Sequence, residues 1–212
     1  MKAVITEIRE LRNGVRVTVN DQITLCLTRR DWETLSLREG DAVDVKALRH
    51  DLLLSQYPAA LGRAVRLLSV RARSCFEIEK RLTDACYLED TVEMVLTKLQ
   101  SEGLLDDEAF ARQWARERSA RQIGRARILH ELRQKGVGGE LAEKALAELD
   151  PAQQNGGAAK LAAKLLKRYQ NLPANEARKK TVMAMQRRGY AYGECLTALD
   201  FEMTEEEEGF YN

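Results

Sequence analysis

The 212-residue sequence has few aromatic residues and little that could support metal or redox chemistry. Aromatics make up 6% of the chain, which argues against a platform that stacks the bases of single-stranded nucleic acid. The two histidines, His50 and His130, have no ligand partners at metal spacing, and the four cysteines are scattered without a C-x-x-C pair. We therefore expect reduced thiols in a cytoplasmic protein that holds no metal ion and no cofactor.

Other absences concern membranes and catalysis. The sequence has no apolar run of about 18 residues and no apolar core of a signal peptide near its start. The run Gly136-Val137-Gly138-Gly139 follows a helix pattern and is not followed by Gly-Lys-Ser/Thr, so it predicts a turn and not a phosphate loop. No Ser/His/Asp or Cys/His combination is placed by its spacing. We expect neither a membrane protein nor an enzyme with a small-molecule substrate.

What the sequence does contain is a block that recurs three times with a period of about 50 residues. Each copy is a helix pattern, a short turn and a second helix pattern that ends on leucine. The copies run from Phe76 to Leu96, from Ala126 to Leu146 and from Lys179 to Leu199. Such a period is typical of a stacked array, in which each unit buries its apolar face on its neighbours. Because arrays present long surfaces to large partners, we expect a binding protein.

The first 48 residues follow the alternating pattern of strands instead. Apolar residues alternate with polar ones in 15–19 and in 23–27, and Asn20-Asp21 between them tolerate the positive φ of a hairpin turn. Further strands are expected at Val4–Ile8 and at Val43–Ala47. Between these, Thr28 is placed to cap a short helix through Leu37.

From Tyr57 onward the apolar period changes from 2 to 3.6, which indicates helices. The first repeat predicts helices at about 58–70, 74–85 and 89–102, and Ser74 with Glu77 forms a capping box. The third repeat is interrupted by Gly156-Gly157 and by a proline at 173. The inter-helix turn of the first repeat has Cys86 where the others have Gly136 and Gly189, so we expect it to close differently.

These patterns predict a mainly α fold class, a tandem array of three three-helix repeats with a small β-rich N-terminal module. Net charge is close to neutral overall, yet residues 151–200 carry 9 Lys and Arg against 3 Asp and Glu, and residues 201–212 carry 5 acidic residues and no basic one. The expected domains are the β-rich module (1–56), the first repeat (57–104), the second repeat (105–150), the third repeat (151–200) and an acidic tail (201–212).

Basic side chains crowd the second and third repeats and are the candidate partner-binding residues. The guanidinium fork suits phosphate and carboxylate alike, so the charges alone leave open whether the partner is nucleic acid or an acidic protein surface. Simple solubility of the helices, with Glu117 and Glu131 as partners within the helices, is the alternative interpretation. The candidates are Arg112, Arg116, Arg121, Arg125, Lys164, Lys167, Arg168, Lys180 and Arg187.

Three stretches resemble a known family. Gly103-Leu104-Leu105-Asp106-Asp107-Glu108-Ala109-Phe110-Ala111, followed by Arg118, is similar to the signature of the RecX family of recombinase regulators. So are Arg71-Ala72-Arg73-Ser74 with Glu77, and Gly124 through Ile128 to Val137. The resemblance covers about residues 57–200.

The resemblance implies an elongated, curved array that binds RecA, the bacterial strand-exchange ATPase. It would lie in the groove of the RecA–DNA filament as a monomer and inhibit the recombinase, ATPase and coprotease activities, with consequences for DNA repair, recombination and the SOS response. The proposed role of the basic residues is to meet the acidic RecA surface or the DNA backbone.

An alternative function is binding of single- or double-stranded DNA without RecA, through helix-turn-helix-like use of the three-helix units. Against it, the last helix of the second repeat exposes Glu140, Glu143 and Glu148, which suit a major groove poorly. Steep salt dependence of binding to naked DNA would favour this alternative.

Overall fold

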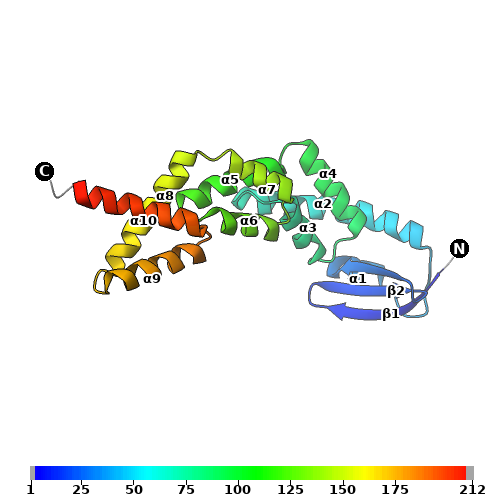
Figure 1. Cartoon of the computed structure of the whole chain (residues 1–212). Coiled ribbons are helices and arrows are strands. Elements are labelled where there is room, and N and C mark those ends of the chain that lie inside the picture. Colours follow the sequence, from blue (N-terminus) through cyan, green and yellow to red (C-terminus); the bar gives the residue numbers. More distant parts are fainter. Residues whose placement is uncertain (1–2, 209–212) are drawn as a thin grey trace. The chain divides into compact units, whose positions relative to one another are not determined.

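The computed structural model describes residues 3–208, apart from the side chains of Gln153 and of residues 201–208. This part of the chain contains ten helices and four strands, labelled in Figure 1. The chain divides into two compact units, Met1–Asp106 and Asp107–Asn212. The side chains of the predicted acidic tail, 201–212, lie outside what is described; the backbone of the last helix runs to Glu208.

The first unit begins with an antiparallel sheet of β1 (Ala3–Leu11), β2 (Gly14–Val19), β3 (Ile23–Thr28) and β4 (Ala42–Val43), in the order β3-β2-β1-β4. The alternating valines of β2 are buried, as are the leucines of β3. The predicted hairpin is confirmed, since Asn20 and Asp21 have φ angles of 50° and 55°. Helix α1 (Arg29–Leu35) follows β3, and Thr28 caps it as predicted.

The end of the β-rich module differs from the prediction. Only Ala42–Val43 is a strand, because the Asp44 side chain accepts hydrogen bonds from the amides of Lys46 and Ala47 at 3.0 and 3.2 Å and starts a helix. This helix, α2 (Val45–Val70), passes through Pro58, where the sequence predicted a helix start. Its first half packs on the sheet and its second half on the first repeat, and this burial on both sides outweighs the one hydrogen bond that proline removes.

Gln56 in the middle of α2 connects three elements of the first unit. Its side chain is 2% exposed, and its Nε2 donates to Asp31 Oδ2 of α1 at 2.8 Å. Its Oε1 accepts from the Leu88 amide at 2.9 Å and from the Thr91 hydroxyl at 3.2 Å. Both its amide nitrogen and its amide oxygen thereby have partners, as a buried amide requires. No local sequence signal predicted this network.

The remaining helices of the first repeat are α3 (Cys75–Thr83) and α4 (Glu89–Ser101). The predicted capping box is confirmed: the Ser74 side chain accepts from the Glu77 amide, and the Glu77 carboxylate accepts from the Ser74 amide. Helices α2, α3 and α4 enclose a core that includes Ala64, Ile78 and Val95.

The second unit contains two three-helix repeats, coloured green and yellow to red in Figure 1. The interruption of the third repeat predicted at Gly156-Gly157 is wrong. Asp150 caps the first helix of this repeat, and the helix continues through both glycines. The second repeat consists of α5 (Asp107–Ala120), α6 (Arg125–Gln134) and α7 (Gly139–Ala147), and the third of α8 (Pro151–Arg168), α9 (Ala174–Arg187) and α10 (Tyr192–Glu208).

The inter-helix turns of the three repeats close in the same way, which overturns the expectation for Cys86. Its φ is 61°, beside 75° at Gly136 and 93° at Gly189. The residue after each donates its amide to the carbonyl five positions back, from Tyr87 to Leu82 and likewise in the other two repeats. Cysteine therefore adopts the left-handed conformation that glycine adopts elsewhere, and its contacts must compensate.

Candidate partner-binding surface

The predicted basic residues of α5 differ in whether they already have an ionic partner. Arg112 lies 2.8 Å from Glu108, and Lys144 of α7 reaches the same carboxylate at 2.6 Å. Lys144, and then Arg112, hold the pKa of Glu108 below its ordinary value. Arg116 and Arg121 are exposed and form no ion pair within the described part of the chain. The two unpaired arginines are therefore the ones free to meet an external anion.

An aromatic side chain organises the inner face of the second repeat. Trp114 donates from Nε1 to Glu131 at 3.2 Å, and the guanidinium of Arg118 and the ammonium of Lys135 lie 4.4 and 4.2 Å from its ring centroid. Arg118 also approaches Glu131 at 2.7 Å. Since Glu131 and Trp114 balance these cations within the repeat, the cluster contributes to its stability more than to a binding face.

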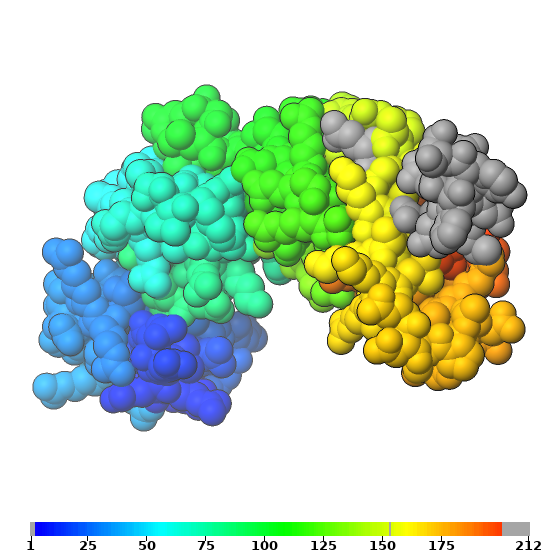
Figure 2. Space-filling model, turned by 90° about the vertical axis from the view of Figure 1, so that its left-hand side faces the viewer, coloured from blue at the N-terminus to red at the C-terminus, as the bar shows by residue number. Residues whose placement is uncertain are grey.

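Helix α8 carries the longest run of cations without ionic partners. Lys160, Lys164, Lys167 and Arg168 recur at helical spacing, are all exposed, and form no ion pair within the described part of the chain. In Figure 2 the yellow surface of α8 lies open to solvent beside the green surface of the second repeat. These four residues are called the α8 stripe below. Their number and spacing make the α8 stripe the most strongly cationic helix face described.

The predicted basic residues of α6 and α9 are partly engaged. Arg125 pairs with Glu143 of α7, and Lys180 pairs with Glu176 one turn earlier at 2.9 Å. The Arg187 Nε donates to the carbonyl oxygen of Met183 at 3.3 Å. Such exposed pairs exchange readily with solvent and with a stronger anion, but each would have to break before binding.

Two glycines bring cations of the second and third repeats together. The Gly124 amide donates to the Arg188 carbonyl at 2.9 Å, and the Ala126 amide to the Gly189 carbonyl at 3.1 Å. Arg127 Nη1 reaches the Arg187 carbonyl at 3.4 Å. Arg125 and Arg127 thereby lie beside Arg187 and Arg188, far apart in sequence. Gly124 occupies the position that Ser74 occupies in the first repeat. This glycine was the available signal of a close contact here, and the contact was not predicted from the sequence.

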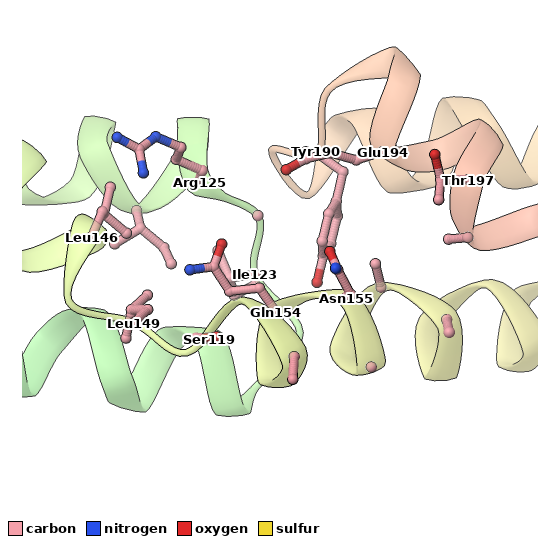
Figure 3. A pocket seen from close by; sticks show the side chains of 17 residues that line it. Ser119, Ile123, Arg125, Leu146, Leu149, Gln154, Asn155, Tyr190, Glu194 and Thr197 are labelled. Carbon is pink, nitrogen blue, oxygen red and sulfur yellow. The ribbon is translucent and has the colours of Figure 1, made fainter. Parts of the chain in front are cut away.

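A pocket of about 540 Å³ lies beside this contact, between the second and third repeats. Figure 3 shows Tyr190 extending from the turn between α9 and α10 toward α8, near Asn155. Leu146 and Leu149 lie on the side of the second repeat. Burial, and then the charge of Glu194, raises the pKa of Tyr190 to about 12. The walls of the pocket are mostly apolar, and the charged residues that line it are Arg125 and Glu194.

Family models match the first and second repeats of the chain. The model of the first three-helix domain of RecX matches residues 60–99, and that of the second three-helix domain matches residues 106–146. The regulatory protein RecX of Mycolicibacterium smegmatis is 38% identical over 149 residues, which are 68% of this chain and 79% of that protein. The chain belongs to the RecX family. The resemblance and the fold class predicted from sequence are thereby confirmed.

Solved RecX structures share this fold. A crystal structure of regulatory protein RecX superimposes with a TM-score of 0.65 at 26% identity, covering 93% of this chain and 99% of the other. A crystal structure of RecX from Lactobacillus salivarius gives a TM-score of 0.63 at 26% identity, with 72% of this chain and 99% of the other covered. The matched RecX domains correspond to the region from α2 to α7.

Among residues 3–208, no helix has both the length and the apolar character that crossing a bilayer requires.

Proposed function

We propose that this chain is a negative regulator of RecA that binds the RecA–DNA filament and lowers its recombinase, ATPase and coprotease activities. The observation that carries the proposal is family membership, with a relative named regulatory protein RecX that is 38% identical over two thirds of this chain. The chain would act by binding and would not catalyse a reaction itself. The basic residues predicted from sequence remain the proposed contacts.

The charge pairs separate these contacts into two groups. Arg116, Arg121 and the α8 stripe can meet a phosphate or carboxylate without first losing an ionic partner, whereas Arg112, Arg125 and Lys180 must leave Glu108, Glu143 and Glu176. We therefore assign the larger share of binding to the unpaired group. Each exposed contact is worth about 0.2–1 kcal/mol, so affinity must come from several together.

The contact between Gly124 and Gly189 supports simultaneous binding by both repeats of the second unit. Backbone hydrogen bonds hold the start of α6 against the end of α9, so the cations of the two repeats keep a fixed spacing. A preformed spacing removes the entropy cost of aligning the second contact once the first has formed. A regular polymer such as a filament offers repeated sites to a surface of this kind.

The test is the steady-state ATPase rate of RecA on single-stranded DNA, titrated with the chain. We expect inhibition below one chain per RecA. An unchanged rate at excess chain, with the chain shown to be folded, would contradict the proposal.

Binding to DNA alone is the competing function, and salt separates the two. If naked DNA were the target, log K would fall with log salt by about 0.9 for each phosphate neutralised, with or without RecA. Tight binding to naked duplex or single strands, unaffected by added RecA, would transfer the assignment to this second function. Binding that requires RecA would support the first.

A further inference from the structure

The inter-helix turn of the first repeat has a cysteine in a conformation that favours glycine. Cys86 has a φ of 61°, and the equivalent turns use Gly136 and Gly189. A side chain in the left-handed region costs free energy that glycine avoids, so the cysteine must gain something from its surroundings. Cys86 is almost fully buried, at 3% exposure, so the compensating free energy comes from contacts with other residues and not from solvation.

The contacts of Cys86 lie on the outer face of the sheet. Gly14 in β2 leaves room for it: a Cβ there would lie 2.8 Å from the Cys86 Cβ and 3.0 Å from its Sγ. In the β2–β3 register Gly14 faces Thr28 and Arg16 faces Cys26, so these four positions share the face opposite the valine core. Burial, and then the neighbouring Cys26 thiol, raises the pKa of the Cys86 thiol.

A neighbouring hydrogen bond fixes this arrangement. Asn13 Nδ2, at the start of β2, donates to the Asp84 carbonyl at 2.7 Å, which holds the β1–β2 turn against the same inter-helix turn. Gln56 joins α1 to the start of α4. The segments that carry the two cysteines are therefore anchored to each other by hydrogen bonds that do not involve the thiols. Both are free thiols in this structure.

We propose that Cys26 and Cys86 are an oxidisable dithiol, which a peroxide converts to a disulfide that fastens the β sheet to the first repeat. Cys26 is partly exposed, so a peroxide can reach it, and it is the attacking residue. Burial raises the pKa of the Cys86 thiol, which keeps it protonated and makes it the resolving residue.

The reaction balances with hydrogen peroxide as the oxidant. The Cys26 thiolate attacks one peroxide oxygen, the O–O bond breaks, and sulfenic acid forms with release of hydroxide, which takes a proton to become water. The Cys86 thiol then loses its proton and attacks the Cys26 sulfur, expelling a second hydroxide that is protonated to water. Two thiols lose two electrons and two protons, and one peroxide becomes two waters.

The resulting bond would close a loop between residues 26 and 86, which contains the end of β3 and all of α1, β4, α2 and α3. A crosslink over a loop of this length restricts the unfolded chain far more than the folded one, in which the two cysteines are already neighbours. Oxidation would therefore stabilise the first unit without rearranging it. The inference does not depend on the proposed RecA function, because its readouts are chemical and thermal.

The experiment treats the full chain with hydrogen peroxide, blocks remaining thiols, and maps disulfides by mass spectrometry. We expect loss of two of the four thiols, a peptide joining Cys26 to Cys86, and a higher Tm that a reductant reverses. The matched variant is Cys86→Gly, which the turn accommodates because glycine occupies it in the other repeats; it should form no crosslink and show no rise in Tm. Cys75→Ser, at another partly exposed cysteine, should leave the crosslink intact.

The opposite results overturn the proposal. Recovery of all four thiols at peroxide doses that oxidise a control dithiol, or a crosslink through Cys75 in place of Cys26, would show that the Cys26–Cys86 contact is packing alone. The Cys86→Ser variant retains a side chain at the turn and should trap sulfenic acid on Cys26. Absence of that adduct in a folded variant would exclude Cys26 as the attacking residue.

Discussion

Gly124 and Gly189 touch backbone to backbone: a Cβ on Gly124 would lie 2.3 Å from the carbonyl carbon of Gly189. In the other direction, a Cβ on Gly189, whose φ is 93°, would lie 2.5 Å from the Arg127 amide nitrogen. Neither glycine can accept a side chain without separating α6 from α9. The pair is thus the point at which the second and third repeats are joined most closely.

We expect Gly124→Ala to lower the free energy of unfolding of the second unit by about 2–3 kcal/mol, because the inserted methyl group meets backbone that cannot rotate away. Chemical denaturation followed by circular dichroism measures the change. Gly139→Ala in α7 is the control: no atom lies within 4 Å of its Cβ position, so stability should be unchanged or slightly raised. Equal effects of the two substitutions would refute the close contact.

Gln56→Leu should destabilise the first unit by about 2–4 kcal/mol. Leucine fits the space but leaves the Leu88 amide, the Thr91 hydroxyl and a side of the Asp31 carboxylate without their partner in a buried site. The midpoint in urea gives the measurement. Gln100→Leu on the exposed face of α4 is the matched control and should change stability by less than about 0.5 kcal/mol.

Charge removal should separate the unpaired cations from the paired ones. We expect the triple substitution Lys164→Ala, Lys167→Ala and Arg168→Ala to weaken binding to a RecA–DNA filament about tenfold, from the sum of three exposed contacts. Arg112→Ala with Lys180→Ala removes cations that already have carboxylate partners and should weaken it less. Fluorescence anisotropy of a labelled chain measures both, and a larger loss in the second variant would reverse the assignment.

Tyr190 should make the second unit sensitive to alkaline pH. Its folded pKa is raised to about 12 from an ordinary value of 10.0, so its contribution to stability is fully present below pH 10 and is lost as pH rises toward 12. Tyr190→Phe removes this contribution. The difference in free energy of unfolding between wild type and variant should therefore shrink by about 1 kcal/mol as pH rises from 10 toward 12, after allowance for partial exposure. Tyr192→Phe, at a residue that is 59% exposed, is the control for loss of a tyrosine hydroxyl from the surface.

The repeats were predictable because apolar periodicity and caps are local properties. The Ser74–Glu77 capping box and the Asn20-Asp21 turn each depend on residues within a few positions, and both are confirmed. The predicted start of α2 was wrong because it followed the change of apolar period at Tyr57, whereas the helix begins after Asp44, whose side chain caps it.

The features that failed depend on contacts between distant segments. Nothing local shows that Cys86 adopts the conformation of glycine, since the contact with Gly14 and Cys26 that compensates it comes from the sheet. The same holds for Gly124 and Gly189, which look like ordinary helix boundaries until they are placed together. Among the candidate basic residues, sequence located the cations but gave no means of knowing which carboxylates from other helices neutralise them.

The close glycine contact beside an open pocket has a mechanical consequence. Since the backbones of α6 and α9 are fastened at one edge while the small and apolar side chains of the pocket leave the other edge unfilled, any bending of the second unit turns about the fastened edge. The fastened edge fixes the spacing between the cations of α6 and those of α9, whereas the cations of α8 lie on the helix that borders the unfilled edge.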